Sequence, residues 1–400
     1  MKILVSGASV AGPSAALWLG RAGHDVTVVE IAPALRQGGY AVDFRGEVFT
    51  TVLSRMGVLE ELRSLQTGGN AMRFVDEKGR KLMRMPAEFA GGELEVLRSD
   101  LSRVLYEHSC AQATYRFGDS IAALHEDSGG VDVRFESGIE ETYDLVVGAD
   151  GMHSVVRRLA WPQEQVVERH LDYYVGGWEV PNTMGISGDT LMYNVPGKLA
   201  GVGGDRRDPS LAQTLFMFKS PVLEYDRRDL AQQKAILREQ FSGLGWHVPA
   251  LLEALPAATE LYFDSISRVR VDHWSTDRIV LLGDAGYGAT FGALGTGTAV
   301  VGAYVLAGEL AQAQGDLRTA FERYEARLRK AVSTTQDGSR AGSFLAPATR
   351  FGITARNKIL DIPFFMNQML KMAQNMSELI ELPTYPISSA SGQEGQLEQK

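Results

Sequence analysis

The sequence predicts an α/β fold, in which a parallel β-sheet with covering helices is interrupted by an inserted antiparallel β-sheet. Three observations predict it. Two short runs rich in β-branched residues flank a helix-like segment between residues 2 and 30. From about 168 to 270, several segments alternate apolar and polar residues, as antiparallel strands do. At 278–282 the apolar-strand pattern returns, followed by a glycine-rich loop and a second long helical segment.

The first thirty residues have the size and order of a strand–helix–strand unit. We expect strands at 2–6 and 26–30, and between them a helix at 11–22 that Gly23 closes. The residues that follow carry further elements of both kinds. They are helices at 48–65 and 99–111, a hairpin at 72–85, and strands at 131–135 and 143–147.

The middle of the chain is expected to be mainly β, with Pro196-Gly197 as a turn and one helix at 227–241. The expected strands of this insert are 171–180, 190–194, 199–202 and 213–219. After the strand at 278–282, apolar residues at helical spacing predict three more helices. They lie at 296–312, at 317–332 and, rich in methionine, at 358–382.

The parallel-sheet pattern therefore occupies both ends of the chain and brackets the β insert. We expect the segment 350–382 to form a C-terminal helix bridging the two parts, since methionine suits irregular packing. The polar residues 387–400 are expected to be disordered. The predicted domains are a discontinuous first domain at 1–70, 95–165 and 275–340, and a β domain at 71–94 and 166–274.

The composition is ordinary for a globular protein and excludes several classes. Of 400 residues, 44% are hydrophobic, and the net charge of −9 comes without a basic tract, which speaks against nucleic acid as a partner. The single cysteine, Cys110, excludes an internal disulfide, and the seven histidines are scattered, so no metal is expected. The apolar stretch 299–310 is too short to cross a bilayer, and we expect no signal peptide, because the first residues lack a long apolar core and a small-residue cleavage site. We expect a cytoplasmic monomer with no membrane partner.

The turn after the first strand carries a dinucleotide-binding fingerprint with one departure. Gly7 and Gly12 stand where a tight turn and close helix–strand packing need glycine, but Ser9 replaces the middle glycine. The free N–H groups at the helix start would hold a diphosphate, and Glu30 would accept hydrogen bonds from a ribose. The alternative, a tight turn without a ligand, leaves Glu30 unexplained. The expected binding residues of this unit are Gly7, Ser9, Val10, Ala11, Gly12 and Glu30.

Two distal motifs bear on which dinucleotide is bound, because NAD and FAD use the same unit. Asp150 and Asp284 each follow a strand end, where a carboxylate can accept hydrogen bonds from the ribityl hydroxyls of a flavin. The helix that starts near Gly295, Thr296 and Gly297 would direct its positive dipole end toward the flavin pyrimidine edge, which gains negative charge on reduction.

In this order, the three motifs resemble the class A FAD-dependent aromatic hydroxylases, the p-hydroxybenzoate hydroxylase group, and most closely their tetracycline-inactivating branch. The resemblance spans roughly residues 1 to 340. It implies that Arg98 contacts FAD, that Arg36 lies near the adenosine end, and that Asp43 lies in a short loop beside the flavin ring. The loop Ala285-Gly286-Tyr287 departs from the family pattern, since no proline follows before Gly297.

The resemblance implies a reaction. In the implied reaction, NAD(P)H is a transient reductant of FAD, and the reduced FAD reacts with oxygen to form a C4a-hydroperoxide. The hydroperoxide then hydroxylates an aromatic or polyketide-like small molecule, such as an antibiotic. The flavin carries this chemistry, so no obligate catalytic side chain is expected, although Arg45 is a candidate at the flavin edge. The candidate substrate-binding residues, for which plain core packing is the alternative, are Trp178, Tyr193, Leu215, Met217 and Phe291.

Three other functions share the scaffold. An FAD-dependent reductase or dehydrogenase would transfer no oxygen, so the mass of the product separates it from a monooxygenase. A flavin halogenase would carry a Gly-Trp-x-Trp-x-Ile-Pro signature, and the nearest string here, 177–181, reads GWEVP. A protein that uses FAD only structurally would hold a flavin that NAD(P)H does not reduce.

Overall fold

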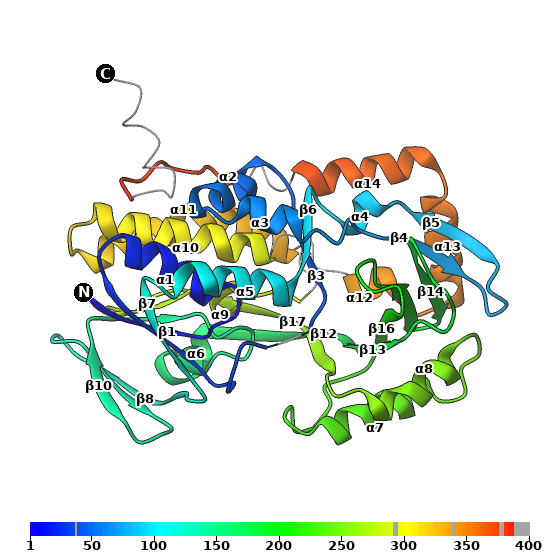
Figure 1. Ribbon diagram of the computed structural model, residues 1–400, viewed down its shortest axis with the longest axis horizontal. Coiled ribbons are helices and arrows are strands. Elements are labelled where there is room, and N and C mark those ends of the chain that lie inside the picture. Colours follow the sequence, from blue (N-terminus) through cyan, green and yellow to red (C-terminus); the bar gives the residue numbers. More distant parts are fainter. Residues whose placement is uncertain (37, 291–294, 338–340, 376–379, 388–400) are drawn as a thin grey trace.

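The computed structural model describes residues 1–36, 38–290, 295–337, 341–375 and 380–387. Two bodies lie side by side in Figure 1, a parallel sheet with its helices on the left and a large antiparallel sheet on the right. The parallel sheet has the strand order β18-β11-β1-β2-β7. Its strands are β1 (Lys2–Ser6), β2 (Asp25–Glu30), β7 (Ala113–Phe117), β11 (Leu145–Gly148) and β18 (Ile279–Leu281). The predicted α/β class with an inserted antiparallel sheet is confirmed.

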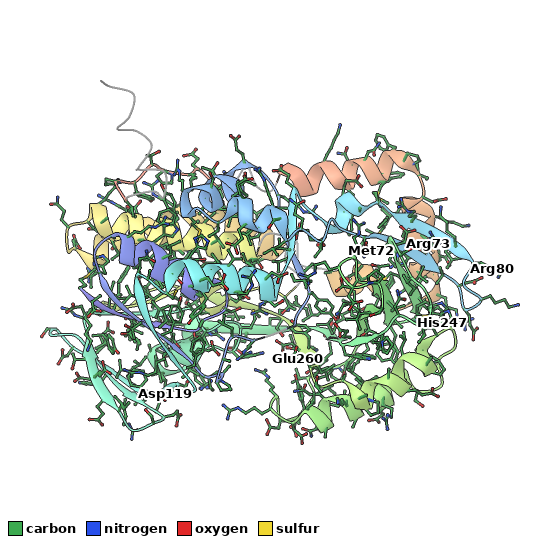
Figure 2. The ribbon with its side chains drawn as sticks, viewed as in Figure 1. Met72, Arg73, Arg80, Asp119, His247 and Glu260 are labelled. Atoms are coloured by element: carbon green, nitrogen blue, oxygen red, sulfur yellow. The ribbon has the colours of Figure 1, made fainter. Side chains whose placement is uncertain are left out.

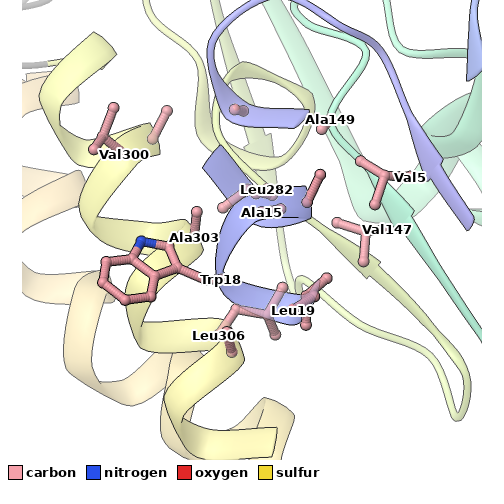
Figure 3. Packing of buried hydrophobic residues seen from close by; sticks show 14 of the residues in the cluster. Val5, Ala15, Trp18, Leu19, Val147, Ala149, Leu282, Val300, Ala303 and Leu306 are labelled. Carbon is pink, nitrogen blue, oxygen red and sulfur yellow. The ribbon is translucent and has the colours of Figure 1, made fainter. Parts of the chain in front are cut away.

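Helix α1 (Ala11–Arg21) connects β1 to β2 and is buried along most of its length. It packs on α10 (Gly295–Gln312), and Figure 3 shows Ala15 and Trp18 of α1 beside Val300, Ala303 and Leu306 of α10. Small residues on both helices permit this close approach. Helices α11 (Leu317–Asp337) and α5 (Arg98–Ser109) pack against α10 and α1 respectively, so helices predicted from spacing form one layer over the sheet.

The antiparallel sheet has the order β17-β12-β16-β15-β14-β4-β5, with β13 paired to β16. The hairpin predicted at 72–85 joins it, since β4 (Ala71–Val75) pairs antiparallel with β5 (Lys81–Met85) and parallel with β14 (Asp189–Val195). Helices α7 (Leu230–Phe241) and α8 (Val248–Ala254) cover one face. The remaining strands are β12 (Val166–Gly177), β13 (Glu179–Pro181), β15 (Lys198–Gly204), β16 (Leu211–Lys219) and β17 (Tyr262–Val271).

Two long paired strands, β12 and β17, join the two bodies across the centre of Figure 1. One end of the pair lies in the antiparallel sheet, where Gly177 pairs with Tyr262. Toward the other end, Val269 N donates to Gly288 O at 2.8 Å and Thr290 N donates to Ser267 O at 2.9 Å. The side chain of Glu260, just before β17, lies between the two bodies in Figure 2, with Asp119 on one side and Met72 on the other.

The smaller elements fill the space around these sheets. A three-stranded sheet at the lower left of Figure 1 consists of β8 (Ile121–Glu126), β9 (Val131–Phe135) and β10 (Glu140–Tyr143). A two-stranded ribbon pairs β3 (Ala41–Phe44) with β6 (Leu94–Leu97). The short helices are α4 (Ala87–Ala90), α6 (Val155–Ala160), α9 (Asp284–Tyr287) and α12 (Ala341–Leu345).

Two long helices predicted from the sequence are each divided in two. The segment 48–65 forms α2 (Glu47–Met56) and α3 (Leu59–Ser64), because Gly57 takes a left-handed conformation with φ of 82°. At the C-terminus, α13 (Arg350–Leu360) ends before Pro363, which begins α14 (Pro363–Asn375). Proline lacks the N–H that a helix interior needs but fits a first turn. A single helix over 350–382 is therefore wrong.

Other expectations differ in detail or lie outside the described residues. Helix α7 begins at Leu230, after the predicted 227, because the Asp229 side chain accepts a hydrogen bond from Gln232 N and caps it. Residues 376–379 of the predicted C-terminal helix and residues 388–400 of the predicted tail lie outside the described residues. The division of the chain into domains stays a prediction. Among the helices that the structure describes, none has the length and apolar character needed to cross a membrane.

Candidate functional site

The turn between β1 and α1 has no space for side chains at its two glycines. Gly7 has φ of 106°, and a Cβ there would lie 2.6 Å from Ala149 O. A Cβ on Gly12 would lie 1.8 Å from Gly7 O, so the helix start packs directly on the turn. The N-cap residue of α1, Val10, provides no side-chain hydrogen bond, which leaves the N-terminal N–H groups of Ala11 and its neighbours available to an anion.

Glu30 joins the end of β2 to this turn. Its Oε2 accepts a hydrogen bond from Ala8 N at 2.8 Å, and its Oε1 accepts one from Ala32 N at 3.0 Å. Arg36 Nη2 lies 3.6 Å from the same Oε1, so two residues that the sequence assigns to the adenosine end lie together. Each carboxylate oxygen can accept a second hydrogen bond, which is what a ribose diol requires.

Arg98, the first residue of α5, lies beside the same turn. Its Nη2 and Nε donate to Ser9 Oγ at 3.1 and 3.3 Å, and its backbone N donates to Tyr40 O at 3.2 Å. The arginine that the family resemblance assigns to FAD therefore lies next to the N-terminus of α1. A guanidinium and free N–H groups together form a site suited to a diphosphate.

Asp284 follows β18 and begins α9. The residue is exposed, whereas Ala285, Gly286 and Tyr287 are buried. Protein surrounds the carboxyl on its other sides, so desolvation raises the pKa of Asp284, and the positive charge of Arg98 acts in the opposite direction. A Cβ placed on Gly283 would lie 3.1 Å from Ala299 and 3.2 Å from Ala11, so this turn lies between the starts of α10 and α1.

The start of α10 has two different surroundings. Among the described residues, the atom nearest to a Cβ on Gly295 would be Asp284 Oδ1, at 4.0 Å, and Thr296 is partly buried. Gly297 is buried, and a Cβ there would lie 2.7 Å from the Phe49 ring of α2. Gly295 therefore adjoins the space beside Asp284, while Gly297 permits helix packing.

Asp150 serves a structural purpose that the sequence does not reveal. Its Oδ1 accepts from Ser154 Oγ at 2.5 Å, and its Oδ2 accepts from the backbone N of Val155 and Val156 at 2.7 and 3.1 Å. Burial raises the pKa of the Asp150 carboxyl, and these hydrogen bonds partly oppose the shift. Because both oxygens cap α6, a direct contact between Asp150 and a cofactor stays a prediction.

Arg45 and Asp43 form an ion pair with each other. Arg45 Nη2 donates to Phe89 O at 2.6 Å and Nη1 donates to Glu88 O at 3.3 Å, so the guanidinium holds β3 to α4. Its side chain is only 14% exposed. These contacts account for Arg45 without catalysis, and its role at the flavin edge stays a prediction.

The substrate-site candidates divide between the two faces of the antiparallel sheet. Leu215 and Met217 pack in the cluster that faces α12, α13 and α14. Trp178 and Tyr193 pack in the other cluster, under α7 and α8, where Trp178 lies 4.7 Å from Phe216 between ring centroids. One pocket cannot be lined by residues of both faces. Phe291 lies outside the described residues.

Sequence reasoning missed two tyrosines on the face of Leu215. Tyr40 OH donates to Gly176 O at 2.9 Å, and its ring lies 5.3 Å from the ring of Tyr262. Burial raises the pKa of Tyr262, the negative charges of Asp264 and Asp284 add to the shift, and the positive charge of Arg98 opposes it. Tyr262 belongs to the antiparallel sheet, but Arg98 and Asp284 of the first body are close enough to affect its pKa. The period-two spacing of Tyr262 and Asp264 in β17 is the signal that could have identified Tyr262.

The donors and acceptors that converge here suit FAD better than a metal. Within the described ranges, no group of three or more His, Cys, Asp or Glu side chains is placed to hold a metal ion. The glycine turn, the uncapped start of α1 and Arg98 fit a diphosphate. Asp284 at its exposed turn fits a hydroxylated linker.

Comparisons with known proteins agree with this arrangement. Residues 1–187 match the family model described as an FAD binding domain. A flavin-dependent monooxygenase of Legionella longbeachae is 35% identical, covering 97% of this chain and 99% of the relative. The crystal structure of the tetracycline destructase Tet(51) is similar with a TM-score of 0.85 at 32% identity, covering 96% of this chain and 99% of that one. That of Tet(55) gives 0.82 at 33%, covering 96% and 98%. The chain therefore belongs to the family of FAD-dependent monooxygenases.

Proposed function

We propose that this FAD-dependent monooxygenase consumes NAD(P)H and oxygen to hydroxylate an aromatic or polyketide-like small molecule. The observation that carries the proposal is the position of Tyr262. Its hydroxyl has no hydrogen-bond partner among the described residues. The side chain packs on the apolar face of the sheet, and the charges of Arg98 and Asp284 both act on the pKa of its hydroxyl. A substrate held at Tyr262 would therefore lie between the sheet and the cofactor.

The side chains around Tyr262 favour a flat, apolar substrate. Tyr40 and Leu215 are partly buried on the same face, and Phe89 and Phe344 lie 5.9 Å apart between ring centroids beside the same cluster. Aromatic walls with a few polar groups are typical of sites for ring-bearing ligands. Since Tet(51) and Tet(55) are named tetracycline destructases, a tetracycline is the first polyketide to test.

Different residues would bind different parts of the cofactor. The turn Gly7–Gly12 and Arg98 would bind the diphosphate, Glu30 and Arg36 the ribose of the adenosine, and Asp284 the ribityl chain. Reduced FAD supplies the oxygen-activating chemistry, and the protein orients the substrate and excludes water from the reacting centre. The monomeric state and the cytoplasmic location stay predictions from the sequence.

The test is the visible spectrum of the purified protein, followed by NAD(P)H oxidation in air with a panel of phenols and tetracyclines. We expect oxidised-flavin bands and faster NAD(P)H consumption with at least one compound, which gains one oxygen atom. A compound that accelerates NAD(P)H consumption and is itself reduced would favour the alternative, an FAD-dependent reductase. Bound flavin that neither NADH nor NADPH reduces would contradict both.

A further inference from the structure

Ser9 occupies the position at which the dinucleotide fingerprint has its middle glycine. Its hydroxyl accepts hydrogen bonds from Arg98 Nη2 at 3.1 Å and Arg98 Nε at 3.3 Å. Ser9 Oγ also lies 3.4 Å from Ser102 Oγ, one helical turn after Arg98 on α5. The departure from glycine therefore links the turn before α1 to the start of α5.

Arg98 depends on this link for its side-chain position. The backbone of Arg98 is fixed through its N–H bond to Tyr40 O, yet the residue is exposed. Within the part of the chain that the structure describes, Ser9 Oγ is the guanidinium's one hydrogen-bond acceptor. A long exposed arginine side chain without that acceptor would sample many rotamers.

We propose that Ser9 is a positioning residue for Arg98. Its hydroxyl holds the guanidinium beside the uncapped N-terminus of α1, so that the diphosphate of FAD meets a cation already in place. The ordering of a flexible side chain during binding weakens affinity, and pre-organisation removes that loss. We therefore expect this protein with the usual glycine in place of Ser9 to bind FAD more weakly than the wild type does.

The test is the FAD dissociation constant of apoprotein, followed by the quenching of flavin fluorescence. We expect Ser9→Ala and Ser9→Gly each to raise the constant about tenfold, equivalent to ~1.4 kcal/mol. Ser14→Ala is the matched control, because Ser14 lies on α1 and its hydroxyl donates within the helix, to Val10 O at 2.8 Å. That control is expected to bind FAD as the wild type does.

A double-mutant cycle with Arg98→Lys separates positioning from a direct contact of Ser9 with FAD. Lysine keeps the charge but lacks the planar fork that reaches Ser9 with two nitrogens. In the Arg98→Lys background, we expect Ser9→Ala to change the dissociation constant less than about twofold, which would show that Ser9 acts through Arg98. Circular dichroism and thermal melting of each apoprotein verify that the variants fold.

Two results would overturn the proposal. If the Ser9→Gly variant binds FAD as tightly as the wild type, or more tightly, the hydroxyl does not strengthen FAD binding. A full tenfold loss on Ser9→Ala in the Arg98→Lys background would assign Ser9 a role independent of Arg98. Neither result depends on the substrate, so the proposed reaction is tested separately.

Discussion

At the scale of single residues, the sequence correctly identified the two glycines of the turn before α1, whereas the role of Asp150 became clear only from the structure. Gly7 and Gly12 were predicted because the fingerprint spacing is local, and the close contact between them confirms the tight turn. Asp150 was predicted from its place after a strand, which is also the place of a residue that caps the next helix. A sequence pattern does not distinguish these two uses of a carboxylate, because both need an acceptor at a strand end.

Gly12 provides the most direct residue-scale test of the turn. Gly12→Ala is expected to abolish flavin binding and to lower the free energy of unfolding by about 1–3 kcal/mol, since the new methyl would overlap Gly7 O. Flavin absorbance and urea unfolding measure the two effects. Gly129→Ala is the control, because its nearest contact would be the end of the Asp127 side chain. Wild-type flavin content in Gly12→Ala would contradict the packing described.

Tyr262 provides a residue-scale test of the substrate site. Tyr262→Phe is expected to retain FAD but to lower the ratio of hydroxylated product to NAD(P)H consumed severalfold, because the substrate loses an orienting donor. The raised pKa of Tyr262 keeps the hydroxyl protonated, so this effect should not change between about pH 6 and 9. Tyr225→Phe is the matched control, since Tyr225 packs on Phe263 at the opposite face. If the wild type and both variants give the same ratio of hydroxylated product to NAD(P)H consumed, Tyr262 does not orient the substrate.

At the scale of elements, local signals predicted α1, β1, β2 and α10, whereas non-local contacts decided what the sequence left open. Leu215 and Met217 share a face because they alternate on one strand, which the period of two predicts. Trp178 and Tyr193 belong to other segments, and their face depends on how those segments register with β16. Register between distant strands, such as β4 beside β14, is set by tertiary packing.

The C-terminal segment 380–387 returns from α14 to the first body, where it contacts α10 and α2 (Figure 1). Tyr385 OH donates to Glu309 Oε1 at 2.6 Å, and Arg327 Nε donates to the same oxygen at 2.5 Å. Glu309 is fully buried. A Cβ on Gly308 would lie 2.1 Å from the Tyr385 ring, so the absence of a side chain there makes room for the tyrosine.

Tyr385→Phe is therefore expected to lower the free energy of unfolding by about 2 kcal/mol, because a buried carboxylate loses a hydrogen bond. Cleavage of the C-terminal segment by a protease should become faster at the same time. Urea unfolding and timed proteolysis measure these effects. Tyr106→Phe is the control, since Tyr106 makes ring contacts with Tyr115 and Phe117. Unchanged stability and cleavage would show that the hydroxyl does not anchor this segment.

At the scale of the whole molecule, the pair β12 and β17 and several polar contacts make the two bodies one unit. Arg207 Nη1 donates to Asp100 Oδ2 at 2.5 Å, and Arg206 Nη2 donates to Gly69 O at 2.6 Å. A Cβ on Gly38 would lie 2.6 Å from Glu260 Oε2. The sequence predicted that two halves of one sheet bracket an insert. It did not predict these contacts, because no sequence pattern identifies the partners of exposed arginines.

The buried tyrosines predict how the whole fold responds to alkaline pH. Burial raises the pKa of Tyr287 to about 12, and burial also raises the pKa of Tyr324, whose hydroxyl oxygen lies 3.1 Å from that of Tyr287, well above its ordinary value. An unfolded tyrosine ionises near pH 10, so the stabilisation by these groups is complete below about pH 10 and is lost as the pH rises toward 12. Urea unfolding at rising pH should show this decline, and Tyr287→Phe should reduce its slope. A slope unchanged by Tyr287→Phe would contradict the assignment.

The most direct test of the central claim is the mass of the product formed under isotopically labelled oxygen gas. The purified protein, with FAD and NAD(P)H, is incubated with the compound that most accelerates NAD(P)H consumption. For a monooxygenase, the product gains one oxygen atom, and that atom carries the label of the gas. A product without added oxygen, or with oxygen that carries the label of the water, would contradict oxygen transfer and leave a reductase or a hydrolytic reaction.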